Sequence, residues 1–132
     1  MRAVVFSRPG RIEVADVTSP AIERPTDALV RVTRAAICGS DLHFLHGKTP
    51  TVPGAVLGHE AVGVVETTGP EVTSTQPGQR VVVSFAVACG ACWFCAREQT
   101  NLCEHAAVFG AGPFGGDLAG TQAEMVRVPG PT

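Results

Sequence analysis

The sequence predicts a mainly β domain, a β-barrel or β-sandwich with few and short helices. Runs rich in valine and isoleucine are separated by turn signals at Arg8-Pro9-Gly10, Gly69-Pro70 and Pro77-Gly78. The 132 residues include 15 glycines and 10 prolines, and hardly any segment has apolar residues at helical spacing. Four of the five cysteines lie within residues 89–103, which indicates a metal-organised segment outside the barrel.

The expected strands cover residues 1–6, 12–17, 28–37, 56–67, 80–85 and 122–128. Residues 40–46 predict one helical turn with Ser40 as its N-cap. Asp41 then lies in the first turn, where a negative charge faces the positive end of the helix dipole. Residues from about 86 to 106 are expected to form a protruding lobe whose order comes from its metal rather than from a core.

Length and charge limit the classes of function. A chain of 132 residues is expected to form one domain, residues 1–132, that buries close to two thirds of its unfolded surface. The net charge of −2 and ten scattered lysines and arginines disfavour nucleic acid as a partner. No apolar stretch approaches the roughly 20 residues that span a bilayer, and the N-terminus has no export signal. We therefore expect a soluble, cytoplasmic protein with no membrane partner.

The cysteine cluster has the spacing of a structural zinc site. Cys89, Cys92, Cys95 and Cys103 are separated by two, two and seven residues. A tetrahedral zinc ion takes four thiolates at about 2.3 Å, and two-residue gaps let one turn offer successive sulfurs. Two disulfides, an iron–sulfur cluster or an empty site are the alternatives. Disulfides suit a secreted protein, whereas this sequence has no export signal. Ferredoxin sequences place the fourth cysteine three residues after the third, whereas seven residues intervene here.

A second set of metal-ligating residues lies upstream. Cys38 ends an expected strand, and His59 and Glu60 follow about twenty residues later. A catalytic zinc takes three mixed protein ligands and keeps a fourth position open, so Cys38 and His59 are candidates for two of them. Glu60 is the nearby carboxylate, and Asp41 is a candidate acceptor for the other ring N–H of His59. The alternative is that Cys38 is a small buried hydrophobe and His59 an ordinary polar group.

Together these motifs resemble the zinc-dependent medium-chain alcohol dehydrogenases. The resemblance is carried, in order and near the family spacing, by Cys38-Gly39-Ser40-Asp41-x-His43, Gly58-His59-Glu60, Gly78-Gln79-Arg80-Val81 and the four-cysteine lobe. It covers nearly all 132 residues. It implies a GroES-like, partly open β-barrel that carries a catalytic zinc and substrate pocket, with a structural zinc in the lobe.

The resemblance also implies a role for each residue of the motifs. Cys38 and His59 correspond to two catalytic zinc ligands, and Glu60 to a carboxylate that assists ligand exchange. Ser40 matches the hydroxyl that contacts the substrate oxygen, and His43 the histidine that passes its proton toward solvent. Phe85 matches a residue that lines the substrate pocket, although it could equally be an ordinary core aromatic.

Two departures from the family pattern limit the expected activity. The family's third zinc ligand and its Rossmann cofactor domain lie farther along the chain than residue 132. Residues 110–115 match the glycine fingerprint of dinucleotide sites, but no strand–turn–helix context surrounds them, so we expect a loop.

The expected protein is thus the N-terminal catalytic domain of an enzyme that oxidises a small alcohol or polyol to an aldehyde or ketone. Zinc and NAD or NADP are the expected cofactors, homo-oligomers are possible, and the isolated chain is expected to be inactive. A stand-alone zinc-stabilised β-barrel that binds a ligand without catalysis is the main alternative. A zinc ribbon that reads nucleic acid is disfavoured by the charge balance.

Overall fold

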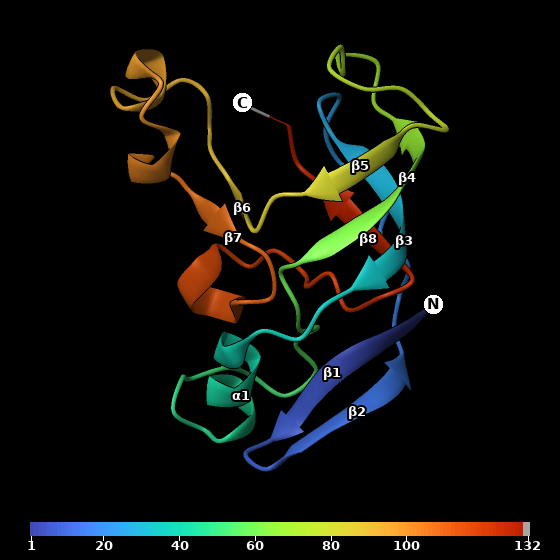
Figure 1. Ribbon diagram of the computed structural model, residues 1–132, viewed down its shortest axis with the longest axis vertical. Helices are drawn as coiled ribbons and strands as arrows, with labels where there is room; N and C mark the ends of the chain where they lie inside the picture. Colours follow the sequence, from blue (N-terminus) through green and yellow to red (C-terminus); the bar gives the residue numbers. More distant parts are fainter. Residues whose placement is uncertain (131–132) are drawn as a thin grey trace.

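The computed structural model describes residues 1–130 and shows a mainly antiparallel β domain (Figure 1). Its strands are β1 (Arg2–Arg8), β2 (Arg11–Asp16), β3 (Ala28–Ala35), β4 (Ala61–Thr68), β5 (Arg80–Val83), β6 (Ala86–Val87), β7 (Ala107–Val108) and β8 (Met125–Val128). Helix α1 (Gly39–Leu45) and the short turns η1 (Cys95–Arg97), η2 (Thr100–Leu102) and η3 (Gly112–Gly115) complete it. Residues 131 and 132 of the expected domain lie outside the described part. Within residues 1–130, no helix has both the length and the apolar character that a membrane crossing requires.

Three sheets share the fold, and they do not close into a continuous barrel. The central sheet has the strand order β5-β4-β3-β8, while β1 pairs with β2 and β6 pairs with β7. Single bridges from β1 to residues 123 and 56 join the first hairpin to the segments before β8 and β4. The prediction of a mainly β, partly open barrel is confirmed. In β4 the alternate residues Ala61, Gly63 and Val65 are buried, so one face of the central sheet points inward.

The hydrophobic core lies on the inner face of the central sheet. It consists of Val30, Ala61, Val65, Val83, Phe109, Leu118 and Val126. Phe109 is 1% exposed and follows β7 directly, so the segment after the lobe is anchored in this core. A smaller cluster of Phe6, Phe44 and Leu57 packs α1 against β1.

Helix α1 begins one residue earlier than the sequence predicts. Its N-cap is Cys38 rather than Ser40, and the backbone N–H of Cys38 donates a 2.8 Å hydrogen bond to Oδ2 of Asp41. Asp41 is buried in the first turn, as expected from the helix dipole. The residue that caps the helix is therefore also a candidate metal ligand.

The strand expected over residues 56–67 begins only at Ala61 because Gly58 interrupts it. Gly58 has φ +96°, and a Cβ there would lie 2.4 Å from Cγ of Gln122. The backbone here pairs with residues 121 and 122 instead. The N–H of Gln122 donates to the carbonyl oxygen of Leu57, and the N–H of Thr121 donates to that of Gly58, both at 2.9 Å. This close approach places His59 directly after a fixed turn, and β8 correspondingly begins at Met125 rather than at residue 122.

A buried aspartate ties the loop before β3 to β8. Asp27 is 0% exposed, and its Oδ2 accepts from the backbone N–H groups of Glu23 (3.0 Å) and Arg24 (2.9 Å). The same oxygen accepts from Nη1 of Arg127 at 3.2 Å, across 100 residues of sequence. A charged, hydrogen-bonded pair of this kind fixes the end of the central sheet.

The cysteine lobe, residues 88–106, projects from the end of a two-residue stem. In that stem Ala86 pairs with Val108 and Val87 pairs with Ala107. Figure 1 shows the lobe, in orange, standing away from the central sheet.

The glycine-rich segment after the stem is a loop and one short turn, η3, rather than the start of a long helix. Gly110 has φ +66°, and a Cβ there would lie 2.5 Å from the carbonyl oxygen of Gly58. Close backbone contact therefore accounts for this glycine without a dinucleotide.

Candidate metal centres

Four cysteine side chains converge at the centre of the lobe. The sulfur atoms of Cys89, Cys92, Cys95 and Cys103 all lie within 4.8 Å of one another. Those of Cys92 and Cys103 are 3.9 Å apart, whereas a disulfide bond measures about 2.05 Å. All four cysteines are free thiols, so the disulfide alternative does not describe this structure. A tetrahedron of sulfurs at 2.3 Å from zinc has edges of about 3.8 Å, which matches the observed separation.

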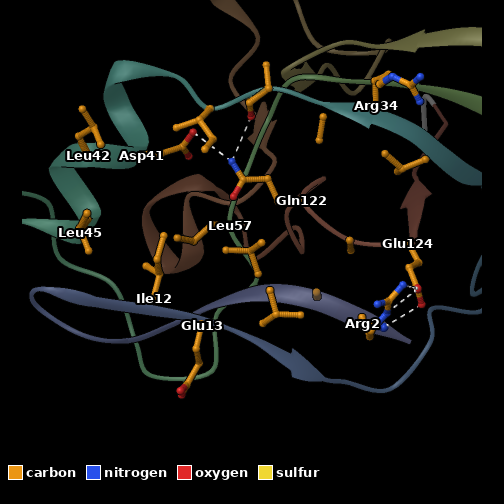
Figure 2. A pocket seen from close by; sticks show the side chains of 18 of the residues that line it. Arg2, Ile12, Glu13, Arg34, Asp41, Leu42, Leu45, Leu57, Gln122 and Glu124 are labelled. Carbon is orange, nitrogen blue, oxygen red and sulfur yellow. Dashed lines mark hydrogen bonds and ion pairs between the residues drawn. The ribbon is translucent and has the colours of Figure 1, made fainter.

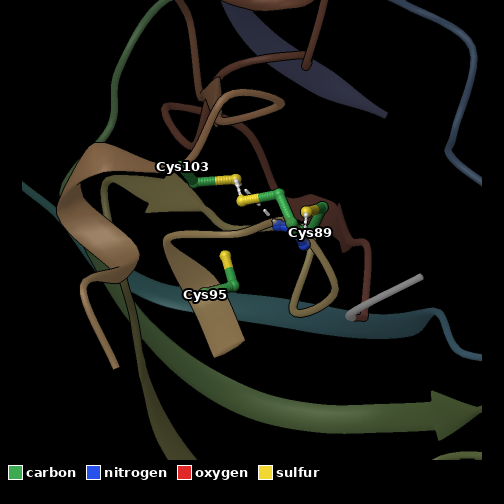
Figure 3. Close-up of side chains that lie close together, drawn as sticks. Cys89, Cys95 and Cys103 are labelled. Atoms are coloured by element: carbon green, nitrogen blue, oxygen red, sulfur yellow. Dashed lines mark hydrogen bonds between the residues drawn. The ribbon is translucent and has the colours of Figure 1, made fainter. Parts of the chain in front are cut away.

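Backbone N–H groups point at these sulfurs. The N–H of Cys89 and that of His105 donate to Sγ of Cys103 at 3.3 and 3.4 Å, and the N–H of Cys92 donates to Sγ of Cys89 at 3.4 Å. Figure 3 shows Cys89, Cys95 and Cys103 close together, with the bonds to sulfur dashed. Hydrogen bonds to sulfur favour the thiolate, which is the form that binds a metal.

The thiols of the cluster differ in acidity. The backbone N–H groups of Cys95 and Glu104 lower the pKa of Cys92 to about 6. Burial, followed by the neighbouring thiol of Cys92, raises the pKa of Cys95 to about 12. A divalent cation among the sulfurs would offset the repulsion between thiolates and deprotonate them together. The donor set and its spacing are thus compatible with a structural zinc ion.

The second cluster, which we call the barrel site, consists of Cys38, His59 and Glu60. Its ligand atoms also lie within 4.8 Å of one another. Cys38 caps α1, and His59 and Glu60 come from the segment between Gly58 and β4. Nε2 of His59 lies 4.0 Å from Oε1 of Glu60, although neighbouring residues on a regular strand would point to opposite faces. The two side chains converge because they precede β4 rather than belong to it.

Asp41 lies on the other side of the His59 ring. Its Oδ1 is 3.9 Å from Nδ1 of His59, beyond hydrogen-bond distance. This oxygen is buried and has no hydrogen-bond partner in the described part of the chain. A buried carboxylate oxygen without a donor is unfavourable, and a ring N–H turned toward it would satisfy it. The ring would then present Nε2 toward Cys38 and Glu60, a donor set that is compatible with a zinc ion.

The other residues predicted for this site lie at different distances from it. Oγ of Ser40 is 3.4 Å from Nε2 of His59, so Ser40 adjoins the barrel site. His43 is exposed one turn further along α1, on the same side of the helix as Ser40.

A shallow groove of about 630 Å³ runs beside the barrel site. It is lined by His59 and Glu60 together with Phe85, Val82 and Val62. Phe85 is 59% exposed, so it is not a core aromatic. An apolar side chain on the wall of a groove that opens at the metal ligands is suited to contact the carbon skeleton of a small molecule.

A larger hollow of about 890 Å³ lies behind α1, between β3 and the β1–β2 hairpin. Figure 2 shows its apolar lining, which includes Ile12, Leu42, Leu45 and Leu57. His59 and Glu60 do not line this hollow but do line the smaller groove, so the metal-ligating chemistry belongs to the smaller groove.

Sequence reasoning missed one residue next to this site. Nε2 of Gln122 donates to the carbonyl oxygen of Ala36 at 3.1 Å and to Oδ2 of Asp41 at 3.3 Å. Gln122 is 81 residues from Asp41, so no local pattern could reveal the contact.

Comparison with known proteins identifies relatives over nearly the whole chain. The model of the alcohol dehydrogenase GroES-like domain matches residues 24–131. An alcohol dehydrogenase of Cupriavidus necator is 42% identical over 98% of this chain and 38% of its own length. A zinc-type alcohol dehydrogenase-like protein of Schizosaccharomyces pombe is 39% identical over 98% of this chain and 34% of its own length.

A solved structure agrees with the fold. The alcohol dehydrogenase TADH from Thermus sp. ATN1 is 55% identical, with a TM-score of 0.95 over 98% of this chain and 37% of that chain. The chain thus spans little more than a third of the length of these relatives.

Proposed function

The chain belongs to the alcohol dehydrogenase GroES-like domain family, and from this membership we propose that it is the catalytic domain of a zinc-dependent alcohol or polyol dehydrogenase. The proposed reaction converts an alcohol to an aldehyde or ketone by transfer of hydride to NAD or NADP. The observation that carries the proposal is the convergence of Cys38, His59 and Glu60 at the mouth of a groove walled by Phe85.

In this proposal Cys38 and His59 hold a zinc ion, which supplies Lewis acidity toward the substrate oxygen. Glu60 is exposed at the edge of the site, where its carboxylate can exchange with other ligands without breaking a buried contact. Cys38, His59 and Glu60 would be the ligands from this chain, and a substrate oxygen would bind beside them. When Glu60 withdraws, a ligand from elsewhere in the protein can take its place.

Ser40 and His43 carry the proton in this mechanism. Oγ of Ser40 lies beside Nε2 of His59 and would take up the hydroxyl proton of a substrate alcohol as it releases its own proton toward His43. His43 follows on the same side of α1 and is exposed, so it can pass that proton to solvent. Phe85 would contact the carbon skeleton of the substrate along the groove and help to orient it.

The nicotinamide cofactor is proposed to bind to a part of the protein that the 132 residues do not include. The chain covers 34–38% of the relatives described above, and the glycine fingerprint at residues 110–115 lies in a loop and a short turn rather than between a strand and a helix. We therefore propose that the isolated chain binds zinc but does not turn over alcohol. The lobe zinc is proposed to be purely structural, because its four thiolates leave no open position.

Metal analysis of the purified chain tests these assignments. We expect two zinc ions per chain, one lost readily to a mild chelator and one retained. Cys38→Ala should remove the labile ion alone. Ser7→Ala, in strand β1 and outside both clusters, is the control and should keep two. A single ion that persists in Cys38→Ala would contradict the barrel site.

A second measurement addresses the substrate. With cobalt in the barrel site, addition of a primary alcohol or aldehyde should change the visible absorption bands of the wild-type chain and not those of Cys38→Ala. Reduction of NAD or NADP by the isolated chain would refute its proposed inactivity.

A further inference from the structure

We propose that Gln122 is a positioning residue of the barrel site, whose side-chain amide fixes the Asp41 carboxylate that orients the His59 ring. The inference rests on the proposed function in that it takes Cys38 and His59 to bind a metal. It adds a residue that neither the sequence motifs nor the fold comparisons single out.

The backbone of Gln122 is fixed on both sides. Its N–H donates to the carbonyl of Leu57 at 2.9 Å, and its carbonyl accepts from the N–H of Val4 at 2.8 Å. Leu57 and Gly58 immediately precede His59, and Gly58 has no Cβ where the Gln122 side chain passes. Gln122 therefore starts from a rigid position beside the segment that carries His59.

The side-chain amide uses both of its hydrogens. Nε2 faces two acceptors, the carbonyl oxygen of Ala36 and Oδ2 of Asp41. A flipped amide would place its oxygen against those same two acceptors, so the orientation is determined by its partners. Figure 2 shows Gln122 reaching from the segment before β8 to the start of α1, with both bonds dashed. The amide thus joins the end of β3 to the first turn of the helix.

These bonds decide which carboxylate oxygen meets His59. Oδ2 of Asp41 receives two N–H donors, from Cys38 and from Gln122, while Oδ1 is left as the buried oxygen that faces Nδ1 of His59. Without Gln122 the carboxylate keeps only the donor from Cys38 and can rotate about its side-chain bond. His59 then loses a fixed acceptor, and its Nε2 is no longer held toward Cys38 and Glu60.

The magnitude follows from comparable metal sites. Loss of a group that orients a ligating histidine costs about 10–100-fold in metal affinity. Gln122 acts on His59 only through its hydrogen bond to Asp41. We therefore expect a loss of zinc affinity of about tenfold, at the lower end of this range.

The experiment measures zinc affinity of the barrel site in the purified chain by competition with a chromophoric chelator. Gln122→Met keeps the length of the side chain and removes both donors. We expect about tenfold weaker zinc binding at the barrel site, with the lobe zinc unchanged, and altered visible bands after cobalt substitution. The matched control is Gln79→Met, whose amide oxygen accepts from Thr75 and Gln76 in the turn before β5. It should leave the affinity of the barrel site unchanged.

A double-mutant cycle separates positioning from general stability. In an Asp41→Ala chain, Gln122→Met should cause no further loss of zinc affinity, because the carboxylate through which Gln122 acts is gone. An equal loss in both backgrounds, or a change within twofold in the wild-type background, would overturn the proposal. If Gln122→Met fails to retain the lobe zinc, Gln122→Asn, which is too short to reach both acceptors, is tested in its place.

The zinc content of the wild-type chain distinguishes failure of the positioning role from failure of the proposed function. Two zinc ions in the wild type and an unaffected Gln122→Met chain refute the positioning role alone. Zinc in the lobe but none in the barrel site refutes the proposed function, and the role of Gln122 falls with it.

Discussion

The cysteine lobe and the barrel site are both candidate zinc sites, but they relate to the fold in opposite ways. Between residues 88 and 106 the only buried side chains are Cys95 and Cys103, so two of the candidate metal ligands take the place of a hydrophobic core in the lobe. The barrel site instead lies at the edge of a core of valines and Phe109, and its ligands are held by a helix cap and a glycine turn. The lobe therefore depends on its ligands for its structure, whereas the ligands of the barrel site are positioned by the rest of the fold.

The largest effect is expected from a substitution that disrupts the lobe and leaves the barrel site intact. Cys103→Ser should release the lobe zinc and expose residues 88–106 to protease, since metal binding contributes about 10–16 kcal/mol in small zinc domains. Zinc analysis and mass-spectrometric mapping of the cleavage sites measure both effects. Cys38→Ser should leave the lobe protected, and cleavage of the lobe in that variant would remove the distinction between the two regions.

A deletion in the core tests the barrel side of the comparison. Phe109→Ala removes a side chain that is 1% exposed and should lower the free energy of unfolding by about 3–5 kcal/mol. The control in the lobe is Leu102→Ala, where the side chain is 52% exposed and the expected change is within about 0.5 kcal/mol. Urea denaturation of the zinc-loaded chains provides both values. Comparable losses would mean that the lobe contains a core of its own.

The glycine turn before His59 is the next test. Gly58→Ala places a methyl group 2.4 Å from Cγ of Gln122 at φ +96°, and we expect a loss of about 3 kcal/mol. Gly54→Ala is a matched control, because Gly54 has φ +87° but nothing within 4 Å of its would-be Cβ. It should cost about 1 kcal/mol from backbone strain alone. Equal thermal shifts in the two variants would show that the contact with Gln122 does not matter.

The smallest effect concerns reactivity rather than stability. In the zinc-free chain, the lowered pKa of Cys92, about 6, leaves it largely thiolate at pH 7, while the pKa of Cys95, about 12, keeps that residue a thiol. The rate of alkylation at Cys92 by iodoacetamide should therefore rise with pH, be half-maximal near pH 6 and level off at higher pH. Peptide mass spectrometry follows each site. Equal rates at all four cysteines would show that the cluster does not persist without its metal.

The sequence was sufficient for the lobe because its ligands are local. Four sulfurs within residues 89–103 must lie near one another whatever the rest of the chain does, so spacing alone predicts the cluster. For the barrel site, residue type alone made Cys38 and His59 candidates, and the family resemblance was needed to join them because they come from separate elements. Only the structure shows that Glu60 also converges there.

Other features depend on contacts between distant residues. Gln122 reaches Asp41 across 81 residues, and Arg127 reaches Asp27 across 100. The early end of the predicted strand at residue 56 likewise follows from Gly58 packing against Gln122, which no local pattern contains. Phe85 could be assigned to the surface only after the course of β5 and β6 was known.

The short stem below the lobe has an evolutionary consequence. Because Val87 pairs with Ala107, the chain leaves and rejoins the rest of the domain at neighbouring positions on either side of residues 88–106. A tight hairpin could replace these residues without cutting any strand of the central sheet. Gain, loss or exchange of such a module by recombination would therefore leave the barrel site intact, so the four-cysteine cluster could be acquired or lost independently of Cys38 and His59.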